Sequence, residues 1–215
     1  MGEFYYSKKK KIRGWKRHIR KIDRWKKEVM EFDLELVRTY QRDYAKLWIH
    51  PFYSLERTHP PAWYNRLLLE AMFDVYFNWH EQMSKESDDF YLKMWLFDPQ
   101  FINSQIVAAY EELKDYYSQV FEQRARIKPF PLYKFNSLSE KIEMFDWELH
   151  IDSENYDSVD LLEDIKEGWR TEKQVNNIRK KAYKTEVMES NNRTHYIYHV
   201  DVGDIWIGSL KRDHR

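Results

Sequence analysis

The amino-acid sequence predicts a mainly α-helical protein of the α+β class, with an N-terminal helical bundle and a smaller α+β portion that ends in a β-hairpin. Apolar residues recur at intervals of three and four along most of residues 12–126, which is the period of an amphipathic helix. The chain of 215 residues has only 5 Gly and 6 Pro but 9 Trp, 16 Tyr and 12 Phe, which is typical of long helices that pack through large rings. After residue 140 the period changes to alternation, and we expect about three antiparallel strands there.

The first predicted helix covers residues 12–47. Its apolar side chains fall within a sector of about 120° when they are plotted at about 100° per residue, as expected for a helix with one buried face. Lys26 and Asp33 interrupt this apolar stripe, so either the helix breaks near them or the stripe is only partly covered there. Pro51 ends the helix, because the residue before a proline is pushed out of the helical region.

Three more helices are predicted before residue 128. Pro61 suits the first turn of the earliest of them, whose apolar residues occupy two adjoining faces. Asp98 and Pro99 suit the N-cap and the first turn of the last. The predicted ranges are 62–83, 88–97 and 98–126. We therefore expect residues 1–127 to form a helical bundle with a basic N-terminal helix.

A linker is predicted over residues 128–135, because Pro129 and Pro131 would disrupt both a helix and an inner strand. Residues 136–215 then form the α+β region. Its first strand is predicted where Trp147, Leu149 and Ile151 alternate with polar residues.

Two helices and a hairpin are predicted after this strand. The first helix covers residues 158–167 and ends at Gly168. The second covers residues 172–188 and begins with a capping box, in which Thr171 is followed three residues later by Gln174. The hairpin consists of residues 194–202, a Gly203-Asp204 turn and residues 205–210.

Basic and acidic residues are segregated along the chain, although 36 of each cancel overall. Residues 1–27 carry 12 Lys and Arg against 2 acidic residues, whereas residues 140–167 carry 2 against 11. The net charge of the chain therefore predicts no attraction to nucleic acid. The charge of single basic segments does predict such an attraction.

Two groups of basic residues are candidates for binding nucleic acid or an acidic protein partner. Each lies on a predicted helix, where a row of cations can bind phosphates, an acidic protein or an anionic membrane surface, or can simply face water. The N-terminal group consists of Arg13, Lys16, Arg17, Arg20, Arg24 and Lys27. The second group consists of Lys173, Arg179, Lys180, Lys181 and Lys184, with Asn176 and Asn177 between them.

The order strand, helix, helix, hairpin over the last part of the chain resembles the end of a winged-helix topology. That resemblance implies that the helix over residues 172–188 enters the major groove and that the hairpin touches the DNA backbone. The preceding helix argues against it, because its acidic residues would lie near the phosphates; they are Asp157, Asp160, Glu163, Asp164 and Glu167. The resemblance rests on the order of elements and not on a sequence match.

A metal site is a weaker candidate. Asp146, Glu148 and His150 share one face of the predicted strand, and carboxylate and imidazole groups bind divalent ions. Neighbours on one strand face lie about 6.5–7 Å apart, so two could share an ion only with help from another element. A solvated strand face is the simpler interpretation, and no bound metal is expected.

Several classes of function are excluded by absent residues. The chain has no Cys, which excludes disulfides, iron–sulfur clusters and thiolate zinc sites. It has no glycine-rich phosphate-binding loop, and no cofactor is expected. No secretory signal and no apolar stretch long enough to span a membrane occurs, so we expect a cytoplasmic protein that is not transmembrane.

These patterns favour a non-enzymatic binding or regulatory protein whose basic N-terminal helix contacts nucleic acid or an acidic protein partner. An alternative is a homo-oligomeric adaptor or inhibitor, in which residues 1–27 dock on residues 140–167 of the same or a neighbouring chain. A metal-dependent hydrolase that uses Asp146, Glu148 and His150 is a third hypothesis. The patterns identify neither the partner nor the oligomeric state.

Overall fold

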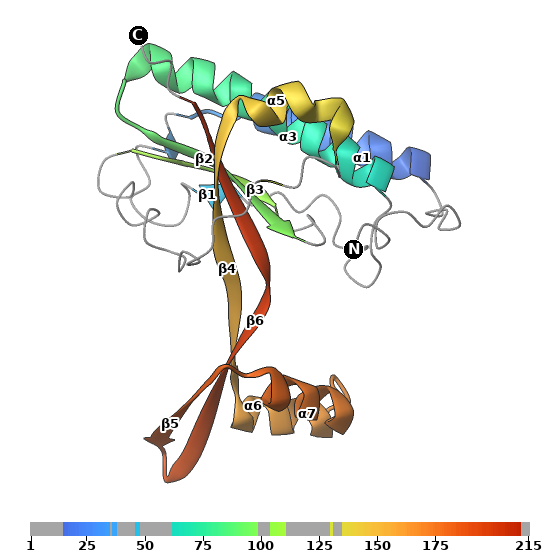
Figure 1. The fold of residues 1–215 in the computed structure, drawn as a ribbon, viewed down its shortest axis with the longest axis vertical. Coiled ribbons are helices and arrows are strands. Elements are labelled where there is room, and N and C mark those ends of the chain that lie inside the picture. The colour runs from blue at the N-terminus through green and yellow to red at the C-terminus, as the bar shows by residue number, and fades with distance from the viewer. Residues whose placement is uncertain are drawn as a thin grey trace. The chain divides into compact units, whose positions relative to one another are not determined.

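The computed structural model describes residues 15–34, 36–37, 46–47, 62–98, 104–110, 130 and 135–211. The chain forms two compact units: unit 1 consists of Met1–His150 and Ile205–Arg215, and unit 2 of Ile151–Asp204. The strands form one sheet in the order β1-β3-β2-β6-β4, and β5 pairs with β6 (Figure 1). The strand pairs with a defined register are antiparallel. The α+β class predicted from the sequence is confirmed.

The long helices of unit 1 are α1, Trp15–Met30, and α3, Ala62–Glu86. They pack against each other, and α3 also contacts the sheet (Figure 1). The indole Nε1 of Trp79 in α3 donates a hydrogen bond of 3.1 Å to the Val29 carbonyl of α1. Ile22 and Trp25 bury the inner side of α1, as its apolar stripe predicts.

Three strands of unit 1 come from the first half of the chain: β1, Lys46–Leu47, β2, Tyr91–Asp98, and β3, Gln105–Ala109. The central strand of these is β3, which pairs with β1 on one side and β2 on the other. All of β3 is buried, and Met94, Trp95 and Leu96 of β2 are fully buried. Burial on both faces gives these strands a continuous apolar run instead of alternation.

Two short helices follow among the described residues of unit 1: η4, Asn136–Leu138, and α5, Ser139–Glu143. They precede β4, Phe145–Asp157, which lies beside β6, Arg193–Leu210. Both strands begin or end in unit 1 and continue into unit 2.

The hydroxyl of Tyr76 joins three segments of unit 1. It donates a hydrogen bond of 3.0 Å to the Leu92 carbonyl of β2 and accepts one of 3.1 Å from the Leu210 amide of β6. Burial raises the pKa of Tyr76 to about 12. The neutral hydroxyl is therefore the form that the fold stabilises.

Asp74 on α3 lies between two lysines. Its carboxylate accepts hydrogen bonds from Lys26 of α1 at 2.6 Å and from Lys141 of α5 at 2.8 Å. Burial alone would raise the pKa of Asp74, but the hydrogen bonds and charges of Lys141 and Lys26 outweigh it, and the pKa is lowered. The Lys26 pair explains why a charged residue interrupts the apolar stripe of α1.

We expect Asp74→Asn to lower the free energy of unfolding by about 1 kcal/mol at neutral pH, because one charged acceptor serves two partly exposed lysines. A lowered pKa stabilises the fold above the unfolded-state pKa, and this contribution is lost as the pH falls through the folded-state pKa. The difference between Asp74→Asn and the parent should therefore shrink below about pH 4. Urea unfolding at neutral and acidic pH measures this, and a difference that does not change with pH would contradict it.

Unit 2 contains two helices and a hairpin: α6, Ser158–Lys166, α7, Glu172–Lys181, and β5, Lys184–Ser190, which pairs with the first part of β6. Its own small core includes Leu161, Val175 and Val200, which are buried outside the main hydrophobic cluster. The Asp157 side chain caps α6 by accepting from the Val159 amide at 2.7 Å. Gly168 has a φ of +77°, which suits the end of a helix.

The predicted all-helical N-terminal region is wrong for the residues that the structure describes. The helix over residues 12–47 ends at Met30, and Lys46–Leu47 form a strand. Strands β2 and β3 replace the helices predicted over residues 88–97 and 98–126. The helix over residues 62–83 is confirmed, as α3, and the helix over residues 12–47 is confirmed over Trp15–Met30, as α1. The predicted linker over residues 128–135 lies mostly outside the described residues and stays a prediction.

The predictions for the second half of the chain are closer to the structure. The strand around Trp147, the helix over residues 158–167 and the capping box at Thr171 are confirmed. The helix over residues 172–188 ends at Lys181, because β5 begins at Lys184. The predicted Gly203-Asp204 turn is wrong, since β6 continues through it and the hairpin turns at Asn191-Asn192.

No helix in the described part of the chain combines the length and the apolar character needed to cross a membrane.

Candidate nucleic-acid interface

Four polar side chains form a stripe on α7, which we call the α7 stripe. Lys173, Asn176, Asn177 and Lys180 lie within a sector of about 100° on a helical wheel. All four are exposed, whereas Val175 on the opposite side of the helix is fully buried. The stripe therefore faces solvent and has a lysine near each end and two amides between them.

A capping box and one buried valine fix how α7 is placed within unit 2. The Thr171 hydroxyl accepts from the Gln174 amide at 3.3 Å, and the Gln174 side chain accepts from the Thr171 amide at 2.8 Å. Val175 anchors the helix in the small core of unit 2, and half-buried Ile178 lies on the same side. The sequence thus directs apolar residues inward and the α7 stripe outward.

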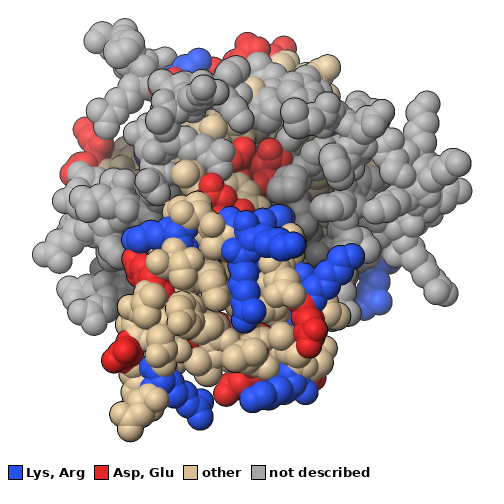
Figure 2. Space-filling model, turned by 60° about the horizontal axis from the view of Figure 1, so that its bottom comes forward, with Lys and Arg blue, Asp and Glu red and all other residues tan. Residues whose placement is uncertain are grey.

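The lysines on α7 have no ion-pair partner among the described residues. Lys173, Lys180 and Lys181 form no ion pair with any residue that the structure describes. Figure 2 shows several Lys and Arg side chains on the face in view, with Asp and Glu side chains between some of them. Unpaired ammonium groups that lie close together attract anions, and phosphates are the most abundant anionic groups on nucleic acids.

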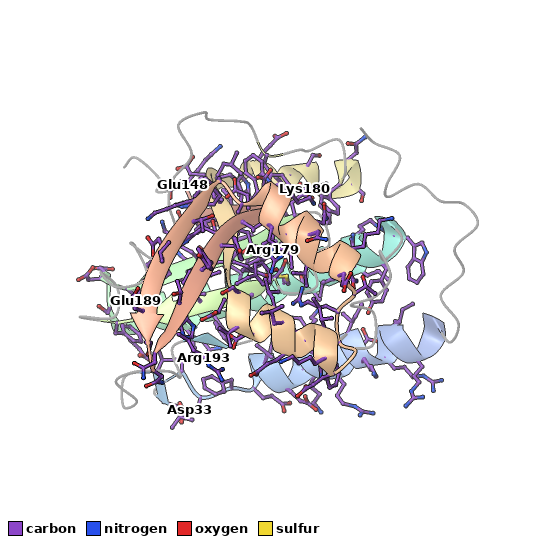
Figure 3. All side chains as sticks on the ribbon, turned by 90° about the horizontal axis from the view of Figure 1, so that it is seen from below. Asp33, Glu148, Arg179, Lys180, Glu189 and Arg193 are labelled. Atoms are coloured by element: carbon purple, nitrogen blue, oxygen red, sulfur yellow. The ribbon has the colours of Figure 1, made fainter. Side chains whose placement is uncertain are left out.

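Arg179 and Lys184, which the sequence groups with these lysines, have partners. The Arg179 guanidinium lies 5.9 Å from the centre of the Tyr198 ring, so it faces β6. Lys184 belongs to β5 and pairs with Glu186 at 2.5 Å, which raises the pKa of Lys184. Neither belongs to the α7 stripe, although Arg179 and Lys180 are neighbours on α7 (Figure 3).

Arg193 is a basic residue that the sequence-based prediction missed. It opens β6 opposite Ser190, directly after the turn formed by Asn191 and Asn192 (Figure 3). These asparagines have φ angles of 52° and 58°, the left-handed conformation that a two-residue hairpin turn requires. The two consecutive asparagines could have indicated the turn that precedes Arg193, because Asn tolerates this conformation better than most residues do.

Acidic residues of unit 2 lie on α6, at its C-cap and on several other elements, and one of them, Glu172, lies in the first turn of α7. Asp160, Glu163 and Glu167 are exposed. Asp164 instead accepts a hydrogen bond of 2.7 Å from Arg170, whose guanidinium also lies over the Tyr156 ring. Asp160 and Glu163 therefore give α6 exposed negative charge, whereas α7 carries one acidic residue, Glu172, in its first turn.

The predicted N-terminal basic row is exposed where the structure describes it. Arg17, Arg20, Arg24 and Lys27 of α1 face solvent, on the side opposite the buried Trp25. Arg13 and the side chain of Lys16 lie outside the described residues. Since α1 belongs to unit 1 and α7 to unit 2, each basic surface must be tested by itself.

The ion pairs of α1 do not involve the acidic segment. Lys26 pairs with Asp74, and Lys27 lies 3.8 Å from Glu31 on the same helix. Lys141, which belongs to the range 140–167, binds the same Asp74. Docking of residues 1–27 on residues 140–167 stays a prediction, because residues 1–14 lie outside the described residues.

Asp146, Glu148 and His150 do not form a metal site in the described part of the chain, where no group of three His, Asp or Glu side chains could hold an ion. Glu148 lies 3.3 Å from His150 and 3.7 Å from Lys93. The hydrogen bond with His150 contributes most to a lowered pKa of Glu148, and the Lys93 charge also lowers it. The metal-dependent hydrolase gains no support from this geometry.

Comparisons of the chain with known protein families, with curated proteins and with solved structures give no match.

Proposed function

We propose that this protein is a non-enzymatic nucleic-acid-binding protein and that α7 of unit 2 is its main contact surface. The observation that carries this proposal is the set of exposed, unpaired lysines on α7, Lys173, Lys180 and Lys181. The topology of unit 2 supports it. A strand, two helices and a hairpin follow one another, with strands in the order β4-β6-β5, and this arrangement presents α7 on the outside.

Electrostatics favour the lysines of α7 over Lys184 of β5 as contacts for a phosphate. A lysine that already pairs with a carboxylate gains little from a phosphate, because it must first give up that partner. The lysines of α7 have no such partner in the described part of the chain, whereas Lys184 is held by Glu186. Each phosphate contact on duplex DNA releases a counterion and steepens the salt dependence of binding.

The basic face of α1 is a second surface for phosphates. Arg17, Arg20 and Arg24 are exposed there and form no ion pair with the described residues. Exposed Lys27 lies on the same face, and α1 has no amide side chain beside these cations, so the face suits contacts with the nucleic-acid backbone. We therefore assign it a supporting role and α7 the main one.

Removing two lysines from the α7 stripe should weaken binding and flatten its salt dependence. We expect Lys173→Ala/Lys180→Ala to lower the log–log salt slope for a mixed-sequence DNA duplex by about 2, since each lost phosphate contact removes about 0.9 from it. Fluorescence anisotropy over a series of KCl concentrations measures the slope. The charge-matched control is Lys85→Ala/Lys211→Ala, which changes two exposed lysines of unit 1.

Two results would overturn this proposal. The first is no binding by the parent chain at low salt. The second is an equal loss in the α7 variant and its control, which would show that only net charge matters. An Arg17→Ala/Arg20→Ala/Arg24→Ala variant separates the two basic surfaces. If that variant alone loses binding, the main contact lies on α1, as the sequence first suggested.

Polyglutamate provides the test for an acidic protein partner. It should compete weakly with the duplex, because its flexible chain cannot offer the fixed phosphate spacing of a double helix. Equal competition per charge would instead identify α7 as a general surface for acidic chains.

A further inference from the structure

The two asparagines of the α7 stripe are not explained by the fold. Asn176 and Asn177 lie in the middle of an exposed helix face, where asparagine is a poor helix former because its side chain competes for backbone hydrogen bonds. Neither amide forms a hydrogen bond with any residue that the structure describes. Both amides are therefore open to an external ligand.

Phosphate binding does not explain them either. An uncharged amide adds little to the attraction for a phosphate, and the lysines already supply that attraction. An amide offers something else, namely one donor group and one acceptor group side by side. That pair matches adenine, which presents the N7 acceptor and the N6 amino donor in the major groove of duplex DNA.

The spacing along α7 fits a helix that lies in a groove. Lys173 and Lys180 stand near the ends of the stripe, and the amides stand between them on the same face. The major groove of B-form DNA is about 12 Å wide and admits an α-helix, with phosphates along both of its edges. The major groove of duplex RNA is too deep and narrow for side chains to read.

We propose that the ligand of α7 is duplex DNA and that Asn176 and Asn177 contact adenine base edges in the major groove, while Lys173 and Lys180 contact the flanking phosphates. This inference rests on the proposed function and adds sequence selectivity to it. The lysines supply affinity for any duplex, and the asparagines supply the preference among sequences.

The test compares the full-length parent with Asn176→Ala/Asn177→Ala. Alanine is a better helix former than asparagine, so the variant should keep α7 folded. A duplex is first selected with the parent from a random-sequence DNA library. The parent should then prefer this duplex over a scrambled one by about 100-fold, and the variant should lose most of that preference, since one bidentate contact is worth roughly 10-fold or more. The affinity for the scrambled duplex and its salt slope should not change.

Chemically altered adenine tests the contact itself. Replacing the adenines of the selected duplex with 7-deazaadenine removes the N7 acceptor and leaves Watson–Crick pairing intact. We expect about a 10-fold loss of affinity for the parent and little change for the variant. The same sequence as duplex RNA should bind the parent no better than the scrambled DNA does.

The outcomes separate the two proposals. If the parent binds no duplex at all, the proposed function fails. If it binds with a steep salt slope but selects no sequence, or if 7-deazaadenine has no effect, the nucleic-acid interface stands and base reading by Asn176 and Asn177 is wrong. Tighter binding to the RNA duplex would likewise overturn the assignment to DNA.

Discussion

Replacing Trp79 with alanine is expected to lower the free energy of unfolding by about 3–5 kcal/mol, the largest effect of any single substitution considered. Trp79 is fully buried in the middle of α3, so its removal leaves a cavity about as large as the indole ring. The substitution also deletes the hydrogen bond from Nε1 to the Val29 carbonyl, which joins α3 to α1. Urea unfolding followed by circular dichroism measures the effect.

A matched control lies on the same helix. Trp63 is 36% exposed, and we expect Trp63→Ala to cost less than Trp79→Ala, because part of the Trp63 side chain already faces water in the folded protein. Equal effects of the two substitutions would mean that α3 does not bury Trp79 between α1 and the sheet. The variant Trp79→Phe should fall between them, since it keeps a ring but loses the hydrogen bond.

Gly208→Ala is expected to destabilise the protein by about 2–3 kcal/mol through overpacking. A Cβ atom at position 208 of β6 would lie 2.5–2.8 Å from three ring atoms of Trp147 on β4, well inside van der Waals contact. The Trp147 ring cannot easily move away. Its Nε1 donates a hydrogen bond of 3.0 Å to the Ile142 carbonyl, and Phe130 packs against the ring at a centroid distance of 4.5 Å.

A double-mutant cycle with Trp147→Leu tests this explanation. The smaller side chain should make Gly208→Ala much less costly, so the two substitutions together should destabilise less than the sum of their single effects. Additive effects would show that the cost of Gly208→Ala has another origin. Thermal unfolding of the four chains gives the required comparison.

The strands β2 and β3 could not be recognised from apolar periodicity. Residues 91–98 are apolar except for Lys93 and Asp98, because most of β2 is buried on both faces, and such a run does not distinguish a buried strand from a buried helix. Asp98 and Pro99 also favoured the incorrect prediction of a helix that starts at residue 98. A carboxylate before a proline resembles a helix start, yet Asp98 is the last residue of β2.

Long-range strand pairing explains the errors near the C-terminus. Gly203-Asp204 is a strong local turn signal, but β6 continues through it to Leu210. Besides β5, the neighbours of β6 in the sheet are β2 and β4, which are distant in sequence, and local propensity carries no information about them. Local capping, in contrast, was predictable, because the Thr171 and Gln174 capping box involves only nearby groups.

The candidate interface was predictable in part. The sequence alone grouped Lys173, Lys180 and Lys181 on one helix, and the structure places all three on α7 as exposed residues. The sequence could not reveal that Lys184 belongs to a strand and pairs with Glu186, because that depends on where α7 ends. The burial of Val175, which defines the outward side of α7, also requires the tertiary structure.

Unit 1 is discontinuous in the chain, since residues 205–215 return to it after the whole of unit 2. During synthesis, therefore, the N-terminal unit cannot be completed first, contrary to the usual order in which domains fold as they leave the ribosome. The bond between the Leu210 amide and the Tyr76 hydroxyl spans 134 residues and must wait for the end of β6. The segments of unit 1 that are made early consequently stay partly uncovered while unit 2 is still being translated.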